Sequence, residues 1–177
     1  MLLLGIDPGK NGGLAIISTS PLEIVDCISV PHAPEGSDDL LDVHAILSFI
    51  QRNMPDLAFI ERVSPMPSID VGKGEKRRTM GATSAFNFGG AVFTLRTCVV
   101  GLGIQPKRVE AAQWKKVYGL SSKDPFTGQK LAQTEVKERS RQAAIKLFGD
   151  RFFPNKGHHN RAEAALIANY GRVLRGL

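Results

Sequence analysis

The chain has 177 residues, of which 42% are hydrophobic. That is enough for one well-filled core and too short for two ordinary domains, so residues 1–177 are predicted to form a single domain. The net charge of +6 is uneven, with −6 over residues 1–50 and +12 over residues 51–177. The basic second part favours a polyanion as partner, although an ordinary solvated surface would have the same composition.

Two further features narrow the class of protein. The apolar run Met1–Leu4 lacks the length and the basic lead of a signal peptide or a membrane span. Cys27 and Cys98 have neither CxxC spacing nor a neighbouring Cys/His cluster, so they indicate neither a disulfide framework nor a zinc site. We therefore expect a soluble, cytoplasmic protein without a membrane partner.

The first three predicted elements are strands. The apolar run over residues 2–6 predicts a strand buried on both faces, which ends at Asp7. Turn residues over 10–13 lead to a second strand over 14–18, and residues 22–30 predict a third. These three strands are expected to form an antiparallel meander.

A helix and a fourth strand are predicted next. Ser37, Asp38 and Asp39 have side chains that cap helix N-termini, and the apolar periodicity after them continues to about Asn53. The apolar run over residues 57–60 then predicts a buried strand that ends at Glu61.

The remaining chain is predicted to be mainly helical after a long loop over residues 62–82. The expected elements are a helix over 83–100, a strand over 103–109, and helices over 111–118, 134–148 and 161–174. This order predicts an α/β protein with a five-stranded mixed sheet, an antiparallel meander of strands 1 to 3, and helices on both faces. It is the order expected of the ribonuclease H-like fold.

Two carboxylates lie at the ends of predicted buried strands. Asp7 precedes Pro8 and Gly9, so it lies where a strand meets a tight turn; alternatively it only caps that turn. Glu61 follows four apolar residues, where a charge is costly unless it binds a metal or forms a salt bridge, for example with Arg62. Both are candidate metal ligands.

The start of the last predicted helix supplies further candidates. His159 and Glu163 are four residues apart and share a helix face, and Asn160 lies three residues before Glu163. A lone histidine is more often an ordinary surface or core residue. Glu163 is the stronger candidate, because it is a charge within an otherwise apolar stretch.

Five segments in order along the chain resemble the RuvC family of Holliday junction resolvases, particularly its phage-encoded members. They are Gly5–Gly9, Ile60–Glu61, Phe86–Gly89, Gln113–Lys116 and Arg161–Ala164. The resemblance implies four metal-coordinating residues: Asp7, Glu61, Glu163 and a residue at 159 or 160. The family commonly has an aspartate at that third position, whereas this chain offers His159 or Asn160, and we favour His159.

The resemblance also implies a cofactor and a reaction. Two Mg²⁺ or Mn²⁺ ions would be held by oxygen ligands, and a histidine among them would suit Mn²⁺ better than Mg²⁺. The expected enzyme is an endodeoxyribonuclease that resolves four-way or other branched DNA by paired symmetric nicks, leaving a 5′-phosphate and a 3′-hydroxyl. A homodimer is expected, with the helix over 83–100 at or near its interface. Its setting would be a bacterial or phage-infected cell.

DNA contacts are expected outside the metal site. The basic residues on or just before the penultimate helix can contact phosphates without reading sequence, and they are Lys123, Lys130, Lys137, Arg139, Arg141 and Lys146. By resemblance, Lys115, Lys123 and Lys130 are the first candidates. Phe86 and Phe88 could wedge between bases or simply pack their helix. The loop cluster Lys76, Arg77 and Arg78 is a further candidate for reaching into a junction.

Two alternative functions remain open at the level of sequence. Another ribonuclease H-like nuclease, cutting flaps, forks or RNA hybrids, would carry the same carboxylates and the same basic surface. A catalytically weak junction-binding protein would explain the missing aspartate near residue 159. A sugar-kinase or actin-like ATPase also opens with a Gly-x-Asp-x-Gly turn, but it needs two such domains, for which 177 residues are too few.

Overall fold

A computed structural model describes residues 1–37, 40–63, 81–124 and 126–177. The elements in chain order are β1 (Leu2–Asp7), β2 (Gly13–Thr19), β3 (Leu22–Ser29), α1 (Val43–Asn53), β4 (Leu57–Arg62), α2 (Ala82–Gly101), β5 (Lys107–Glu110), α3 (Ala111–Val117), α4 (Gln133–Phe148), the 3-10 turn η1 (Lys156–His158) and α5 (His159–Leu174).

The five strands form one mixed sheet in the order β3-β2-β1-β4-β5. The pairs β1–β2 and β2–β3 are antiparallel, whereas β1–β4 and β4–β5 are parallel. This confirms the predicted meander and mixed sheet. Ile6 pairs with Ile60 between the two central parallel strands. Asp7 and Glu61 each follow one of these paired residues, so both carboxylates lie at the same edge of the sheet.

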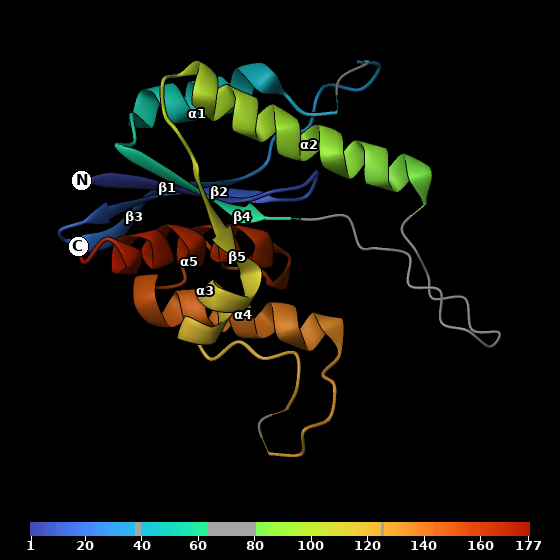
Figure 1. The fold of residues 1–177 in the computed structure, drawn as a ribbon, viewed down its shortest axis with the longest axis vertical. Coiled ribbons are helices and arrows are strands. Elements are labelled where there is room, and N and C mark those ends of the chain that lie inside the picture. Colours follow the sequence, from blue (N-terminus) through green and yellow to red (C-terminus); the bar gives the residue numbers. More distant parts are fainter. Residues whose placement is uncertain (38–39, 64–80, 125) are drawn as a thin grey trace.

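Helices cover both faces of the sheet, as predicted. Figure 1 shows α1 and α2 on one face and α5 on the other, with α3 and α4 outside α5. Each face has its own apolar core, because buried side chains alternate between the two faces along a strand. Leu4 and Ile6 of β1 pack with α1 and α2, whereas Leu3 packs with the alanine-rich α5.

Helix α5 approaches β1 closely because both surfaces carry small residues. A Cβ atom added at Gly5 would lie only 1.9 Å from the carbonyl oxygen of Ala164 and 2.6 Å from the backbone nitrogen of Ala168. At the other end of α5, a Cβ atom at Gly171 would meet the ring of Phe59 at 2.3 Å. The glycines therefore fix how near α5 lies to the sheet.

The start of α1 differs from the prediction. The helix begins at Val43, and its cap is Asp42, whose carboxylate accepts a hydrogen bond of 2.9 Å from the backbone N–H of Ala45. The predicted cap at 37–39 was wrong. Leu41 is buried and pairs with His32 in an isolated antiparallel bridge, so the chain stays extended up to the cap.

Smaller differences affect two other elements. Strand β5 begins at Lys107 and not at residue 103, because Gly103 has a φ of +81° at the end of α2 and Pro106 has no N–H for the sheet. Helix α5 begins at His159, two residues earlier than predicted. None of the helices in the described ranges is long and apolar enough to cross a membrane.

Candidate active site

Asp7 is the last residue of β1 and lies opposite Gly13 of β2. Its side chain is half-buried, and the turn that follows is tight because Gly9 has a φ of +139°. A Cβ atom at Gly9 would lie 3.3 Å from the ring of Phe88. The start of α2 therefore packs against the turn that carries Asp7.

Glu61 lies near the end of β4 and is also half-buried. One of its carboxylate oxygens, Oε2, accepts a hydrogen bond of 2.8 Å from the indole Nε1 of Trp114. Trp114 is fully buried on α3, so its ring is held by packing on all sides. Glu61 does not form the alternative salt bridge with Arg62, because Arg62 pairs instead with Glu110 at 2.9 Å.

Glu163 lies in the second turn of α5 and is half-buried. Its Oε1 accepts a hydrogen bond of 2.8 Å from the hydroxyl of Ser140, a fully buried residue of α4. The contact joins the two helices that cover this face of the sheet. Glu163 is therefore oriented by α4 in the same way that Glu61 is oriented by α3.

The three carboxylates interact electrostatically. Burial raises the pKa of Asp7 well above its usual value of 3.8, and the negative charges of Glu163 and Glu61 raise it further. Burial also raises the pKa of Glu61, and Glu163 adds to this effect. Like charges act on one another in this way only when they are near, so Asp7, Glu61 and Glu163 lie within electrostatic range of one another.

Two lysines partly balance this negative charge. Lys115 lowers the pKa of both Asp7 and Glu61, and Lys137 lowers that of Asp7. The ammonium nitrogen of Lys115 lies 4.9 Å from the centre of the Trp114 ring, over its face. Helices α3 and α4 thus bring positive charge to the carboxylates as well as hydrogen-bond donors.

His159 and Asn160 open α5 and face different surroundings. The ring nitrogen Nδ1 of His159 lies 3.2 Å from the carbonyl oxygen of Lys156, and a carbonyl can only accept, so Nδ1 carries the proton. The other ring nitrogen, Nε2, is buried and has no hydrogen-bond partner among the described residues. The side-chain amide of Asn160 donates to the carbonyl of Asn11.

His159 shares its surroundings with Lys137. The ring lines a hollow of about 550 Å³ between α4 and η1, together with Lys137 and Lys156. Lys137 is also one of the two lysines whose charge acts on Asp7. His159 and Glu163 lie one helical turn apart on α5, as their spacing predicted.

The carboxylates of Asp7, Glu61 and Glu163 and the imidazole of His159 are side chains of the types that bind divalent ions. Within the described ranges, no group of three or more His, Cys, Asp or Glu side chains lies at the distances that hold an ion. Glu61 and Glu163 are instead turned toward Trp114 and Ser140. Each still has a second carboxylate oxygen, and an oxygen ligand of this kind suits a divalent ion.

The predicted DNA-contacting residues other than Lys115 of α3 lie on three segments. Phe86 is 81% exposed at the start of α2, whereas Phe88 is half-buried and packs over Gly9. Lys123 and Lys130 are exposed and face each other in an antiparallel bridge before α4. The predicted contacts Lys76, Arg77 and Arg78 lie outside the described residues.

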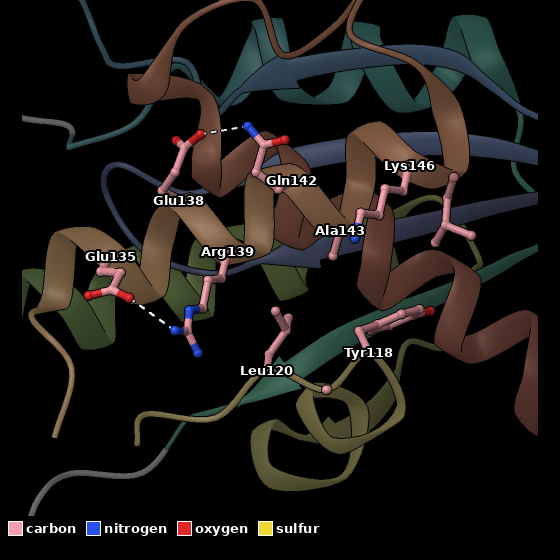
Figure 2. Close-up of a pocket in the computed structure, with 10 residues that line it drawn as sticks. Tyr118, Leu120, Glu135, Glu138, Arg139, Gln142, Ala143 and Lys146 are labelled. Atoms are coloured by element: carbon pink, nitrogen blue, oxygen red, sulfur yellow. Dashed lines mark hydrogen bonds and ion pairs between the residues drawn. The ribbon is translucent and has the colours of Figure 1, made fainter. Parts of the chain in front are cut away.

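A second hollow beside α4 is separate from this site. It has a volume of about 520 Å³ and lies between α4 and the chain that follows α3. Figure 2 shows Tyr118 and Leu120 facing Arg139 and Ala143 of α4 across it. None of the three carboxylates lines it, so it belongs to the packing of α4 and not to the candidate active site.

Sequence reasoning did not find the residues that orient the carboxylates. Ser140 had no distinguishing signal, because a serine in a basic helix is ordinary. Trp114 was noticed only as part of a family motif, and Lys137 only as one basic residue among several. Their roles depend on contacts between residues far apart in the chain.

The raised pKa of Asp7 predicts a pH-dependent stability effect. In the folded, metal-free protein, ionisation of Asp7 lowers the free energy of unfolding. This loss begins as the pH rises above 3.8, the usual pKa, and grows until the pH passes the raised pKa. Asp7→Asn removes this cost, so near pH 8 in EDTA we expect its Tm to exceed that of the wild type by roughly 2–4 °C, the shift for about 1 kcal/mol. The difference should vanish as the pH falls toward 4. Thermal unfolding followed by circular dichroism measures it, and a difference independent of pH would contradict this explanation.

Comparison with solved structures shows which known fold the chain has. The fold is ribonuclease H-like, with a five-stranded mixed sheet and helices on both of its faces. It is similar to the structure of Thermus thermophilus RuvC in complex with a Holliday junction substrate, with a TM-score of 0.61 and 17% identity over 98% of this chain and 96% of that chain. A second Thermus thermophilus RuvC structure gives a TM-score of 0.59 and 19% identity over the same shares. No family model and no curated protein matches the sequence.

Proposed function

We propose that this chain is a structure-selective endodeoxyribonuclease that resolves four-way or otherwise branched DNA. The observation that carries the proposal is that Asp7 and Glu61 lie at one edge of the sheet on neighbouring strands, with Glu163 of α5 within electrostatic range of both. The similarity to a RuvC structure bound to a Holliday junction supports this substrate class. The likeness to phage-encoded members and a cytoplasmic location stay predictions.

Asp7, Glu61 and Glu163 would hold two Mg²⁺ or Mn²⁺ ions through their oxygens. Such ions activate the attacking water and stabilise the leaving oxygen during in-line displacement at phosphorus. Trp114 and Ser140 orient two of the carboxylates, as donors to metal ligands commonly do. Lys115 and Lys137 limit the repulsion among the carboxylates and attract the phosphate backbone of the substrate.

We propose His159 as the fourth ligand. Its Nδ1–H donates a hydrogen bond to the carbonyl oxygen of Lys156. The lone pair is therefore on Nε2, which has no hydrogen-bond partner among the described residues. The amide of Asn160 is occupied by the carbonyl of Asn11 and holds the start of α5 against the turn before β2. A histidine ligand would favour Mn²⁺ over Mg²⁺.

A panel of DNA substrates tests the proposed function. Purified protein should cut a four-way junction faster than a flap, a fork, an RNA–DNA hybrid or a linear duplex of the same sequence, with either metal. Paired nicks at symmetric positions, with 5′-phosphate and 3′-hydroxyl ends, are expected. Preference for the hybrid or the linear duplex would overturn the resolvase proposal, and junction binding without any cleavage would favour a non-catalytic binding protein.

A homodimer would present two such sites to a two-fold junction. The outer face of α2 supports this proposal, because Phe86, Phe93 and Val100 are spaced seven residues apart and are 81%, 69% and 38% exposed. Apolar residues at this spacing lie along one side of a helix and are typical of a seam that packs against another helix. The opposite side of α2 is buried through Ala91 and Leu95.

Phe93→Lys should disrupt this dimer. A charge at the middle of the seam would be buried without a partner, which costs at least about 2 kcal/mol and weakens association at least roughly 30-fold. Sedimentation equilibrium should give about twice the chain mass of 19.2 kDa for the wild type and the single mass for the variant. Val173→Lys, at an exposed position of α5, is the matched control and should remain dimeric. A dimeric Phe93→Lys variant would contradict the assigned interface.

A further inference from the structure

The chain between α3 and α4 carries the most exposed large apolar side chain of the described residues. Phe126 is 94% exposed, and the segment around it projects from the body of the protein beyond α4 (Figure 1). Exposed single apolar residues are common, so exposure alone indicates nothing. The construction of the turn and the charges beside it distinguish Phe126 from Met54 and the other exposed apolar residues.

The turn is fixed by hydrogen bonds centred on Asp124. Its Oδ1 accepts from the backbone N–H groups of Phe126 and Thr127 at 2.9 and 2.8 Å and from the Thr127 hydroxyl at 3.1 Å. The backbone N–H of Gly128, which has a φ of +69°, donates to the Asp124 carbonyl at 2.9 Å. The backbone of Phe126 is therefore held in place before any partner binds, which reduces the entropy lost on binding.

Two lysines lie at the base of the turn that carries Phe126. Lys123 and Lys130 lie opposite each other, and backbone hydrogen bonds close the turn on both sides of this pair. The negative charge of Asp124 is met by Arg139 of α4 at 3.7 Å. The turn thus carries an exposed aromatic residue beyond a pair of exposed lysines.

An exposed aromatic residue and a pair of exposed lysines on one turn fit a partner that is both anionic and aromatic. Nucleic acid has this combination, because phosphates bind lysines and every unpaired base offers a flat face for stacking. Bases within a duplex are already stacked on both sides, whereas bases at a branch point can be unstacked. We propose that Phe126 stacks on an unpaired base at the branch point of a DNA junction while Lys123 and Lys130 contact the adjacent phosphates. This inference rests on the proposed function and assigns a substrate-recognition residue to it.

Binding to junctions with 2-aminopurine at single positions around the branch point tests the stacking. Full-length wild-type and variant proteins are compared in Ca²⁺, and the fluorescence of the base and the dissociation constant are both measured. The wild type should quench one branch-point position. Phe126→Ala should abolish this quenching and weaken junction binding about 5- to 150-fold, the range that base–aromatic stacking covers, while its affinity for a linear duplex stays unchanged.

Matched variants separate stacking from other roles of the ring. Phe126→Trp should retain the affinity and the quenching, whereas Phe126→Leu, apolar but without a π-face, should behave like Phe126→Ala. Equal binding by Phe126→Leu and the wild type would overturn stacking. Equal loss of junction and duplex binding would overturn selectivity for unpaired bases, and loss of self-association in Phe126→Ala would assign the ring to contact with a second copy instead.

Failure of this inference is distinguishable from failure of the proposed function. If the wild type does not prefer the junction over the linear duplex, the proposed function fails and the inference falls with it. If the wild type prefers the junction and Phe126→Ala does so with the same affinity and the same quenching, only the inference is overturned.

Discussion

Replacing Asp7 by Asn is expected to lower metal-dependent cleavage of a four-way junction by three orders of magnitude or more, which corresponds to about 4 kcal/mol of activation free energy. The asparagine amide has nearly the same size as the aspartate carboxylate and should keep the end of β1 intact. It lacks the negative charge that acts together with those of Glu61 and Glu163. Single-turnover cleavage, with enzyme in excess over labelled junction, measures the chemical step separately from product release.

Two controls accompany this variant. Asp7→Asn should bind the junction in Ca²⁺ with an affinity equal to or greater than that of the wild type, because less negative charge faces the phosphates. Asp150→Asn, an acidic residue exposed after α4, should cut at the wild-type rate. Unchanged cutting by Asp7→Asn would show that this site is not catalytic.

Gly5→Ala should have the largest effect on stability. The added Cβ atom would meet the Ala164 carbonyl oxygen at 1.9 Å and backbone and side-chain atoms of Ala168 within 2.9 Å, so α5 must move away from β1. The clash is with backbone and cannot be relieved by rotating a side chain. We expect a loss of at least about 3 kcal/mol, or roughly 6–12 °C in Tm, in thermal unfolding.

Gly101→Ala is the matched control for this substitution. Gly101 is the last residue of α2, and a Cβ atom there would have no neighbour within 4 Å. Its stability should change by less than about 1 kcal/mol. A Gly5→Ala variant as stable as Gly101→Ala would mean that α5 does not pack against β1 as closely as the structure indicates.

The sequence predicted most of the fold because its strongest patterns are also the buried elements. The runs that became β1 and β4 lie in the centre of the sheet, where continuous apolar residues are required. The start of α1 could not be predicted, since residues 37–39 and Asp42 all have cap-forming side chains. The choice is made by tertiary structure, through burial of Leu41 and its pairing with His32.

The candidate site was predictable only in part. Asp7, Glu61 and Glu163 stand out because each is a charge beside apolar residues, and the parallel pairing of β1 and β4 explains why the first two share an edge. The groups that orient them come from α3 and α4 and are ordinary in sequence. Hydrogen bonds from Trp114 and Ser140 span 53 and 23 residues, and no local pattern indicates contacts at such separations.

The most direct test of the central claim is the binding of Mn²⁺ to the free protein by isothermal titration calorimetry. If Asp7, Glu61 and Glu163 share a metal site, the wild type should bind up to two ions, and Asp7→Asn should bind at least roughly tenfold more weakly, because it lacks one of the anionic ligands. Equal Mn²⁺ affinity of the wild type and Asp7→Asn would contradict the account.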